Sequence, residues 1–192
     1  MDKVCKNESG DLMQRGYSSE CFSGNLDKTV TNVVELLKQR GLAIAVAESC
    51  TGGLLSELIT SVSGASEIFE LGICTYSENM KQKMLGVSAE TIENFGVVSS
   101  QTALAMADGL KKCSGADVCI SVTGIAGPSG GTAEQPVGTV YIGFIVGEKR
   151  VFRLPELWLL SDKSRNNIRL AAAEYAFRVV EDLLMEDDSD ER

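Results

Sequence analysis

The chain has 192 residues, 44% of them hydrophobic, which is ordinary for a globular protein and predicts a single domain with a full hydrophobic core. The formal net charge is −9 and no cluster of lysine and arginine is present, which argues against a nucleic-acid partner. No stretch stays apolar over the roughly 18–20 residues that a membrane helix needs. Because the N-terminus also lacks the apolar core of a secretory signal, we expect a cytoplasmic protein with no membrane partner.

Helices and strands alternate along most of the chain. Residues 1–24 are polar and lack periodicity, which predicts a flexible N-terminal extension. Apolar residues then recur at helical spacing from Leu26, and this helix is expected to end at Gly41. The elements predicted after it are a strand over 42–47, a helix over about 52–62, a strand over 69–76, short helices after Ser77 and Ser88, a longer helix after Ser99 or Ser100, strands over 116–122, 137–146 and 150–154, and a helix over about 164–185.

This order predicts an α/β fold, a three-layer α/β/α sandwich around a mixed, largely parallel sheet. The last two strands are separated only by Gly147-Glu148, so they are expected to pair as a hairpin and make the sheet mixed. The single domain is predicted to span residues 25–185. Residues 186–192 are rich in Asp and Glu and are predicted to form a solvated acidic tail.

Histidine is absent from the sequence. Its absence excludes any Ser-His-Asp or Cys-His catalytic arrangement within the chain and removes the commonest zinc ligand. The six cysteines include no Cys-x-x-Cys pair, so they are predicted to be reduced thiols and no metal site or cofactor is expected. A hydrolase with this sequence would have to use Lys, Tyr, Asp or Glu as its side-chain base.

The first cluster of polar residues lies where the strand over 42–47 gives way to a helix. Ser49 is followed by Cys50, Thr51 and two glycines, close to the unpaired N–H groups and the positive end of the helix dipole. A nucleophile placed there could meet a developing negative charge. The pattern alone slightly favours a simpler interpretation, in which Ser49 or Thr51 caps the helix and the glycines form a turn.

The second cluster, Thr75-Tyr76-Ser77 with Lys81, follows the next strand. A lysine can deprotonate a serine only if its pKa is lowered, and burial next to Met80 and Met84 would lower it. The local pattern alone favours simpler interpretations, in which Lys81 is a solvated helix lysine and Tyr76 is an aromatic residue at the edge of the core. The spacing from Tyr76 to Lys81 does not fit the Tyr-x-x-x-Lys pair of a nicotinamide-dependent dehydrogenase, and no G-x-G-x-x-G follows a strand.

The third cluster is the loop from Thr123 to Gly131, which contains four glycines in nine residues. It does not match the P-loop pattern, because no lysine follows it. Its N–H groups could approach a phosphate or a ribose, but such loops are as often plain connections. All three clusters follow strands. In a largely parallel sheet they are therefore expected to converge on one edge.

With these clusters in view, the chain resembles the CinA C-terminal domain family over about residues 26–184. The stretches that carry the resemblance are Ala47-Glu48-Ser49-Cys50-Thr51-Gly52-Gly53, Thr75-Tyr76-Ser77 with Lys81 and Leu85-Gly86-Val87, Gly96-Val97-Val98-Ser99, Ser121 to Pro128, and Pro136-Val137-Gly138-Thr139-Val140. Catalytically characterised members of this family deamidate nicotinamide mononucleotide. The resemblance therefore implies an amidohydrolase that forms nicotinate mononucleotide and ammonia, a step of NAD recycling.

The resemblance also implies roles for particular residues. Ser49 would attack the carboxamide, Lys81 would act as the general base, and Tyr76 would relay a proton or orient Lys81. N–H groups around Thr51, Gly52 and Gly53 would stabilise the oxyanion. The loop from Thr123 to Gly127 and Arg165 would hold the phosphoribosyl part. The full set of implied substrate-binding residues is Glu48, Cys50, Thr51, Gly52, Gly53, Thr123, Gly124, Ala126, Gly127 and Arg165.

The sequence departs from the family in two places. The family's Gly-Asp-Arg before the last helix is reduced here to Ser164-Arg165, and the N-terminal molybdopterin-binding-like domain of full-length members is missing, so the chain resembles the stand-alone form. The resemblance also suggests a homo-oligomer, with a dimer favoured. Two alternatives remain open at this point: a non-catalytic nucleotide-binding or interaction module of the same fold, and Cys50 as the nucleophile.

Overall fold

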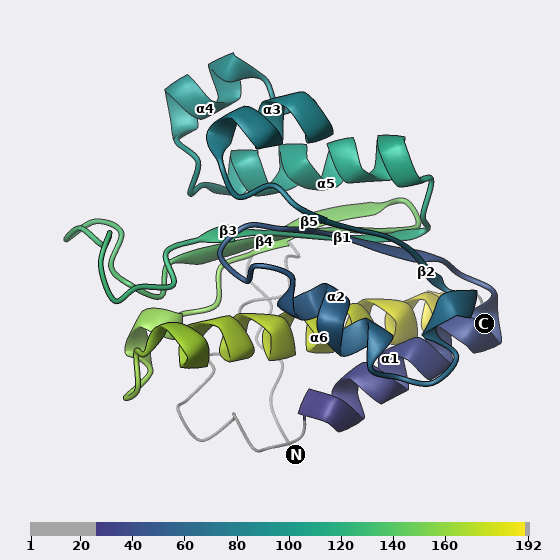
Figure 1. The fold of residues 1–192 in the computed structure, drawn as a ribbon. Helices are drawn as coiled ribbons and strands as arrows, with labels where there is room; N and C mark the ends of the chain where they lie inside the picture. Colours follow the sequence, from purple (N-terminus) through teal and green to yellow (C-terminus); the bar gives the residue numbers. More distant parts are fainter. Residues whose placement is uncertain (1–25, 191–192) are drawn as a thin grey trace.

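A computed structural model of the protein describes residues 26–190. Its described strands form one open sheet in the order β2-β1-β3-β4-β5 (Figure 1). The strands are β1 (Ile44–Glu48), β2 (Phe69–Cys74), β3 (Val118–Gly124), β4 (Val140–Val146) and β5 (Lys149–Arg153).

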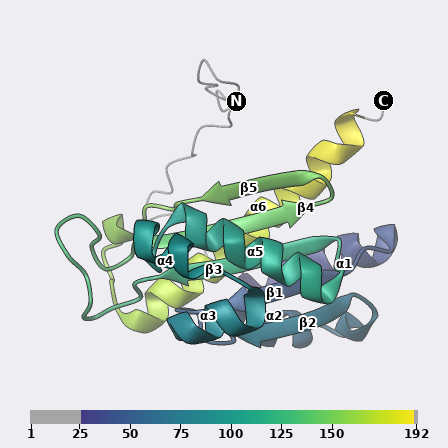
Figure 2. The same ribbon diagram turned by 90° about the horizontal axis from the view of Figure 1, so that it is seen from above.

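Helices cover both faces of this sheet (Figure 1). On one face lie α3 (Glu78–Leu85), α4 (Ala89–Phe95) and α5 (Ser100–Ser114), and on the other lie α1 (Leu26–Arg40), α2 (Leu54–Thr60) and α6 (Arg165–Asp190). Viewed from above, α5 runs along the sheet with α3 and α4 beside it, and α6 passes beneath (Figure 2). The three-layer α/β/α sandwich is therefore confirmed.

The sheet has a parallel half and an antiparallel half. β1 pairs in parallel with both β2 and β3, whereas β3–β4 and β4–β5 are antiparallel. The mixed sheet predicted from the closing hairpin is confirmed, and its antiparallel part is as extensive as its parallel part. In the parallel half, the carboxyl ends of β1, β2 and β3 meet at one edge, where ligands bind in α/β folds.

Burial follows the position of each strand in the sheet. Every residue of β1 is buried, as expected for a central strand covered on both faces, whereas exposure alternates along the edge strands β2 and β5. Successive side chains of β1 belong to different cores. Ile44 and Val46 pack in the cluster shared with α1, α2 and α6, and Ala45 and Ala47 pack in the cluster shared with α5.

Most predicted elements are present within a few residues of their expected bounds. The caps Ser77, Ser88 and Ser99 accept hydrogen bonds from backbone N–H groups three residues on, which fixes where α3, α4 and α5 begin. Two short 3₁₀ helices, η1 (Ala65–Glu67) and η2 (Leu157–Leu159), were not expected.

At the C-terminal end, α6 continues to Asp190, so most of the stretch assigned to an acidic tail is helical. The remainder of that stretch, and the extension expected over residues 1–24, lie outside the described residues. Within residues 26–190, no helix combines the length and the apolar character needed to cross a membrane.

Gly109 lets two helices approach closely. A Cβ atom built at this position in α5 would lie 1.8 Å from the carbonyl oxygen of Leu85, at the end of α3. Helix propensity alone would make Gly109→Ala stabilising. We expect the backbone clash to outweigh this effect, so that the substitution lowers the free energy of unfolding by about 1–3 kcal/mol. Urea denaturation measures this free energy, and Lys112→Ala, at an exposed position of the same helix, is the control. A Gly109→Ala protein more stable than wild type would contradict the close packing.

Candidate active site

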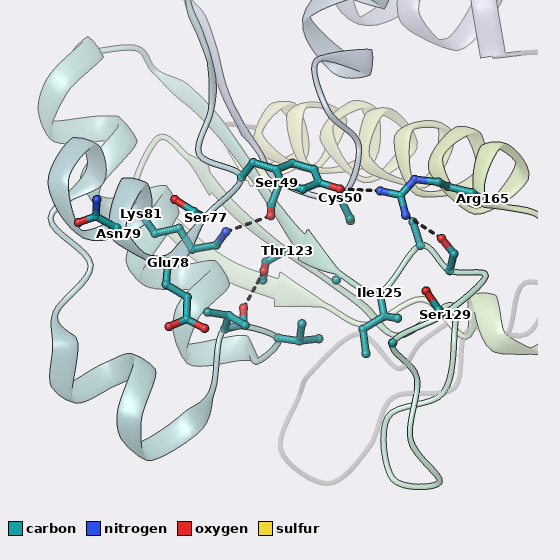
Figure 3. A pocket seen from close by; sticks show the side chains of 17 residues that line it. Ser49, Cys50, Ser77, Glu78, Asn79, Lys81, Thr123, Ile125, Ser129 and Arg165 are labelled. Carbon is teal, nitrogen blue, oxygen red and sulfur yellow. Dashed lines mark hydrogen bonds between the residues drawn. The ribbon is translucent and has the colours of Figure 1, made fainter.

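Ser49 and Lys81 form a buried pair at the edge of the parallel half of the sheet. Lys81 Nζ donates a hydrogen bond to Ser49 Oγ at 3.0 Å (Figure 3). Ser49 directly follows β1, and Lys81 projects from α3, so two segments separated by more than thirty residues meet here. This is the nucleophile–base geometry that proton abstraction from a hydroxyl requires.

Lys81 is only 2% exposed, although it lies on a short helix at the surface. The cap at Ser77 fixes the rotation of α3 so that Lys81, one turn later, points inward. Lys81 Nζ also donates to the carbonyl of Thr75 at 2.8 Å. The interpretation of Lys81 as a solvated helix lysine is therefore wrong. Burial lowers the pKa of Lys81, and the charges of Cys50 and Glu78 only partly oppose this effect.

The pair opens into a pocket of about 620 Å³. All three polar clusters contribute to its walls, as expected from the carboxyl ends of parallel strands. The lining residues are Ser49, Cys50, Tyr76, Ser77, Glu78, Asn79, Lys81, Val97, Val98, Thr123, Gly124, Ile125, Ala126, Gly127, Ser129, Gly130 and Arg165. The structure thus brings together Ser49, Lys81, Tyr76, Cys50, the loop from Thr123 and Arg165.

Cys50 lines the pocket but is a poor nucleophile. Its thiol is buried and forms no disulfide within the described part of the chain. Burial raises the pKa of this thiol to about 12, despite the opposing effects of its own N–H group and of the nearby positive charges of Lys81 and Arg165. A cysteine attacks as the thiolate, which is scarce at neutral pH when the pKa is this high.

Arg165 lies at the first turn of α6 and reaches across the pocket. Its Nη1 donates to the carbonyl of Gly127 at 2.7 Å, and its Nη2 donates to the hydroxyl of Tyr76 at 2.6 Å (Figure 3). Tyr76 is 62% exposed, so it is not a core-edge aromatic. Its hydroxyl makes no hydrogen bond to Lys81 in the described part of the chain, and the carbonyl of Thr75 holds the lysine instead.

Four implied substrate-binding residues lie outside the pocket lining: Glu48, Thr51, Gly52 and Gly53. Two of the three expected oxyanion donors are already engaged, because Gly52 N–H donates to the carbonyl of Ser49 at 3.0 Å and Gly53 N–H donates to Glu48 Oε2 at 3.0 Å. These N–H groups therefore serve the turn itself, which corrects the role expected for the two glycines.

The capping interpretation of this turn is also wrong. The N-cap of α2 is Gly53, and the hydroxyl of Thr51 has no hydrogen-bond partner among residues 26–190. Ser49 Oγ instead receives a hydrogen bond from Lys81. Neither Ser49 nor Thr51 therefore caps α2, and Ser49 lines the pocket instead.

Several pocket residues were missed by sequence reasoning. Glu78 and Asn79 begin α3 within one turn of Lys81, a spacing that could have placed Glu78 on the same side of the helix. Val97 and Val98 belong to a stretch that carries the family resemblance, yet no site role was given to them. They reach the pocket because Thr123 Oγ1 donates to the carbonyl of Val97 at 2.6 Å.

The fold and the site together define an α/β protein with a buried Ser–Lys pair at an open pocket. Within residues 26–190, no group of three or more Cys, Asp and Glu side chains is arranged to hold a metal ion. A family model described as the CinA C-terminal domain matches residues 26–184. The chain belongs to the CinA C-terminal domain family.

Individual relatives agree with this assignment. A putative competence-damage inducible protein of Thermoanaerobacter pseudethanolicus is 46% identical over 153 residues, which cover 80% of this chain and 36% of the relative. The crystal structure of competence/damage inducible protein CihA from Agrobacterium tumefaciens is 37% identical, covers 84% of this chain and 97% of that chain, and has a TM-score of 0.79. A competence or damage-inducible protein from Enterobacter asburiae is 28% identical, with 84% and 99% covered and a TM-score of 0.78.

These comparisons differ in extent. The chain spans 36% of the length of the Thermoanaerobacter relative but nearly all of the two solved structures. The names of the relatives refer to competence and to damage, and they state no reaction.

Proposed function

We propose that this domain is an amidohydrolase that converts nicotinamide mononucleotide to nicotinate mononucleotide and ammonia. The observation that carries the proposal is the 3.0 Å hydrogen bond between the buried Lys81 amine and Ser49 Oγ in a sequence without histidine. A lysine of lowered pKa becomes a neutral amine at lower pH than an exposed lysine, and the neutral amine can accept the serine proton. Membership of a family whose characterised members deamidate this nucleotide supports the choice of substrate.

The reaction proceeds in two halves. Ser49 Oγ attacks the carboxamide carbon while Lys81 Nζ takes its proton, and Lys81 then returns that proton to the nitrogen as the C–N bond breaks and ammonia leaves. The product of this half is an ester on Ser49. A water molecule attacks the ester with Lys81 again as base, and the proton returns to Ser49 Oγ as the acid is released. The carbonyl of Thr75 keeps Lys81 Nζ beside the hydroxyl throughout.

The rest of the pocket suits the phosphoribosyl part of the substrate. A volume of about 620 Å³ lies within the range typical of small-molecule sites. Arg165 presents a guanidinium at the end of the pocket formed by the glycine-rich loop, and a guanidinium can bind a phosphate through two parallel hydrogen bonds. In this proposal Tyr76 orients Arg165 through its hydroxyl and contacts the phosphoribosyl part of the substrate.

Ammonia release from the purified protein tests the proposal directly. We expect nicotinamide mononucleotide to yield equal amounts of ammonia and nicotinate mononucleotide. A coupled enzyme assay measures the ammonia, and chromatography measures the nucleotide product. Nicotinamide riboside lacks the phosphate that Arg165 would bind, so its kcat/KM should be at least about tenfold lower, the usual effect of losing a charged hydrogen bond.

Two outcomes would contradict the proposal in different ways. A folded protein whose melting temperature rises with nicotinamide mononucleotide, but which releases no ammonia, would be a non-catalytic nucleotide-binding module. A protein that neither binds nor hydrolyses this nucleotide would show that the substrate assignment is wrong.

A further inference from the structure

Glu48 is a fully buried acidic residue immediately before Ser49. Its Oε2 accepts hydrogen bonds from the N–H groups of Gly53 at 3.0 Å and Leu55 at 3.1 Å. Its Oε1 accepts from the N–H group of Ser56 at 3.0 Å and from the hydroxyl of Ser56 at 2.9 Å. Four donors match the acceptor capacity of one carboxylate, so this side chain has no capacity left for a ligand.

These contacts give α2 the cap that its own N-cap residue cannot provide. Gly53 has no side chain, yet the first N–H groups of the helix have no partner within the helix and need acceptors. Glu48 supplies them from the end of β1, next to the positive end of the helix dipole. The strand and the helix are thereby joined through a single side chain that bridges the turn containing Ser49.

Strand geometry explains why Glu48 and the nucleophile point in opposite directions. Side chains alternate along β1, and Val46 lies in the core on the α2 side, whereas Ala47 lies in the core on the α5 side. Glu48 continues the α2 side, and Ser49 meets Lys81, which comes from the α3 and α5 side. Fixing Glu48 therefore fixes the side of the sheet to which Ser49 is directed.

The backbone of Glu48 is also linked to the Ser–Lys pair, through Thr75. Its carbonyl accepts the N–H group of Thr75 at 2.8 Å, and the carbonyl of Thr75 accepts Lys81 Nζ at 2.8 Å. On the far side of the turn, Arg169 Nε and Nη2 donate to the carbonyl of Thr51 at 2.9 and 2.7 Å. Two charged side chains of opposite sign thus hold the turn.

We propose that Glu48 is a positioning residue for Ser49, with Arg169 as the second support of the same turn. Glu48 does not line the pocket, so it acts through the nucleophile and not on the substrate. The inference rests on the proposed function in one respect, that Ser49 is the nucleophile. Misplacing a reacting atom by about 1 Å can lower a rate about 100-fold, so the loss of this support should be measurable.

The test measures the reactivity of Ser49 with a chemical probe, so that the result does not depend on whether nicotinamide mononucleotide is the substrate. A small alkyl fluorophosphonate is reacted with the full protein, and both the rate and the final extent of labelling at Ser49 are followed by mass spectrometry. Glu48→Gln replaces two acceptor positions with donors that face N–H groups of α2. We expect complete labelling at a rate about 10–100-fold below wild type, with kcat for the nucleotide lowered to a similar degree and KM within about threefold.

Control variants separate positioning from general stability. Glu57→Gln changes an exposed glutamate of the same helix and should label at the wild-type rate. Ser56→Ala removes one of the four hydrogen bonds to Glu48 and should slow labelling by about 2–5-fold with full extent, which keeps the proposal testable if Glu48→Gln does not fold.

The outcomes are distinct. Wild-type labelling rates in both Glu48→Gln and Ser56→Ala, or a reduced extent at an unchanged rate, would overturn the positioning role. Wild-type protein that is labelled but releases no ammonia would refute the proposed substrate and leave the positioning role standing on the labelling rates. Wild-type protein that is not labelled at Ser49 would refute both proposals.

Discussion

Ser49→Ala is expected to lower turnover of nicotinamide mononucleotide on the order of 10⁴-fold or more, because no covalent ester can form without the hydroxyl. The variant should keep its fold and bind the nucleotide with an affinity close to that of wild type. Steady-state ammonia release gives the rate, and isothermal titration of the variant gives the affinity. Turnover unchanged in Ser49→Ala would refute the assigned mechanism.

The matched control is the neighbouring cysteine. Cys50→Ala removes a thiol whose pKa is raised to about 12 by burial, so it should keep turnover within about tenfold of wild type. If Cys50→Ala were the inactive variant and Ser49→Ala the active one, the nucleophile would be the cysteine.

Lys81→Met should lower kcat by about 10²–10⁴-fold, the range typical of a lost general base, while preserving the shape of the buried side chain. In the wild type, the protonated lysine cannot accept the Ser49 proton. The rate should therefore rise with pH through the lowered pKa of Lys81 and reach its plateau below the ordinary lysine value of 10.5. This rise should be absent from the residual activity of Lys81→Met; the same inflection in both proteins would assign the titration to another group.

Lys81→Met, which should lower the rate, should raise the free energy of unfolding at neutral pH. Between the lowered pKa of folded Lys81 and the ordinary value of 10.5, the unfolded chain binds a proton that the folded protein has released. The free energy of unfolding of the wild type therefore rises with pH across this window. Lys81→Met lacks this dependence, so we expect it to be the more stable protein at neutral pH, with the difference shrinking as the pH approaches 10.5. Denaturant unfolding at several pH values measures both effects.

Much of the fold followed from periodicity and caps. The apolar spacing over the first helix, the Ser77, Ser88 and Ser99 caps and the two-residue hairpin at Gly147 all act locally, so the sequence around each is sufficient to predict it. The convergence of the three polar clusters could also be predicted, because it depends only on parallel strands ending at one edge.

The roles of individual residues around Ser49 could not be predicted in the same way. Glu48 stands in a stretch rich in polar residues, which favoured a binding role, but its direction depends on which helices cover which face of the sheet. Gly53 seemed available as an oxyanion donor because the acceptor for its N–H group, Glu48, could be recognised only in three dimensions. The burial of Lys81 likewise depends on how α3 packs on α5, while the neighbouring Met84 remains half exposed.

The last helix of the chain has a consequence for the order in which the site is assembled. Arg169 supports the turn after Ser49, and Arg165 crosses the pocket, yet both belong to α6. During synthesis, β1, α3 and the glycine-rich loop emerge from the ribosome long before these two arginines do. A nascent chain that stops before Arg169 therefore lacks part of the framework around Ser49, so this serine acquires its full set of supporting contacts only when the domain is almost complete.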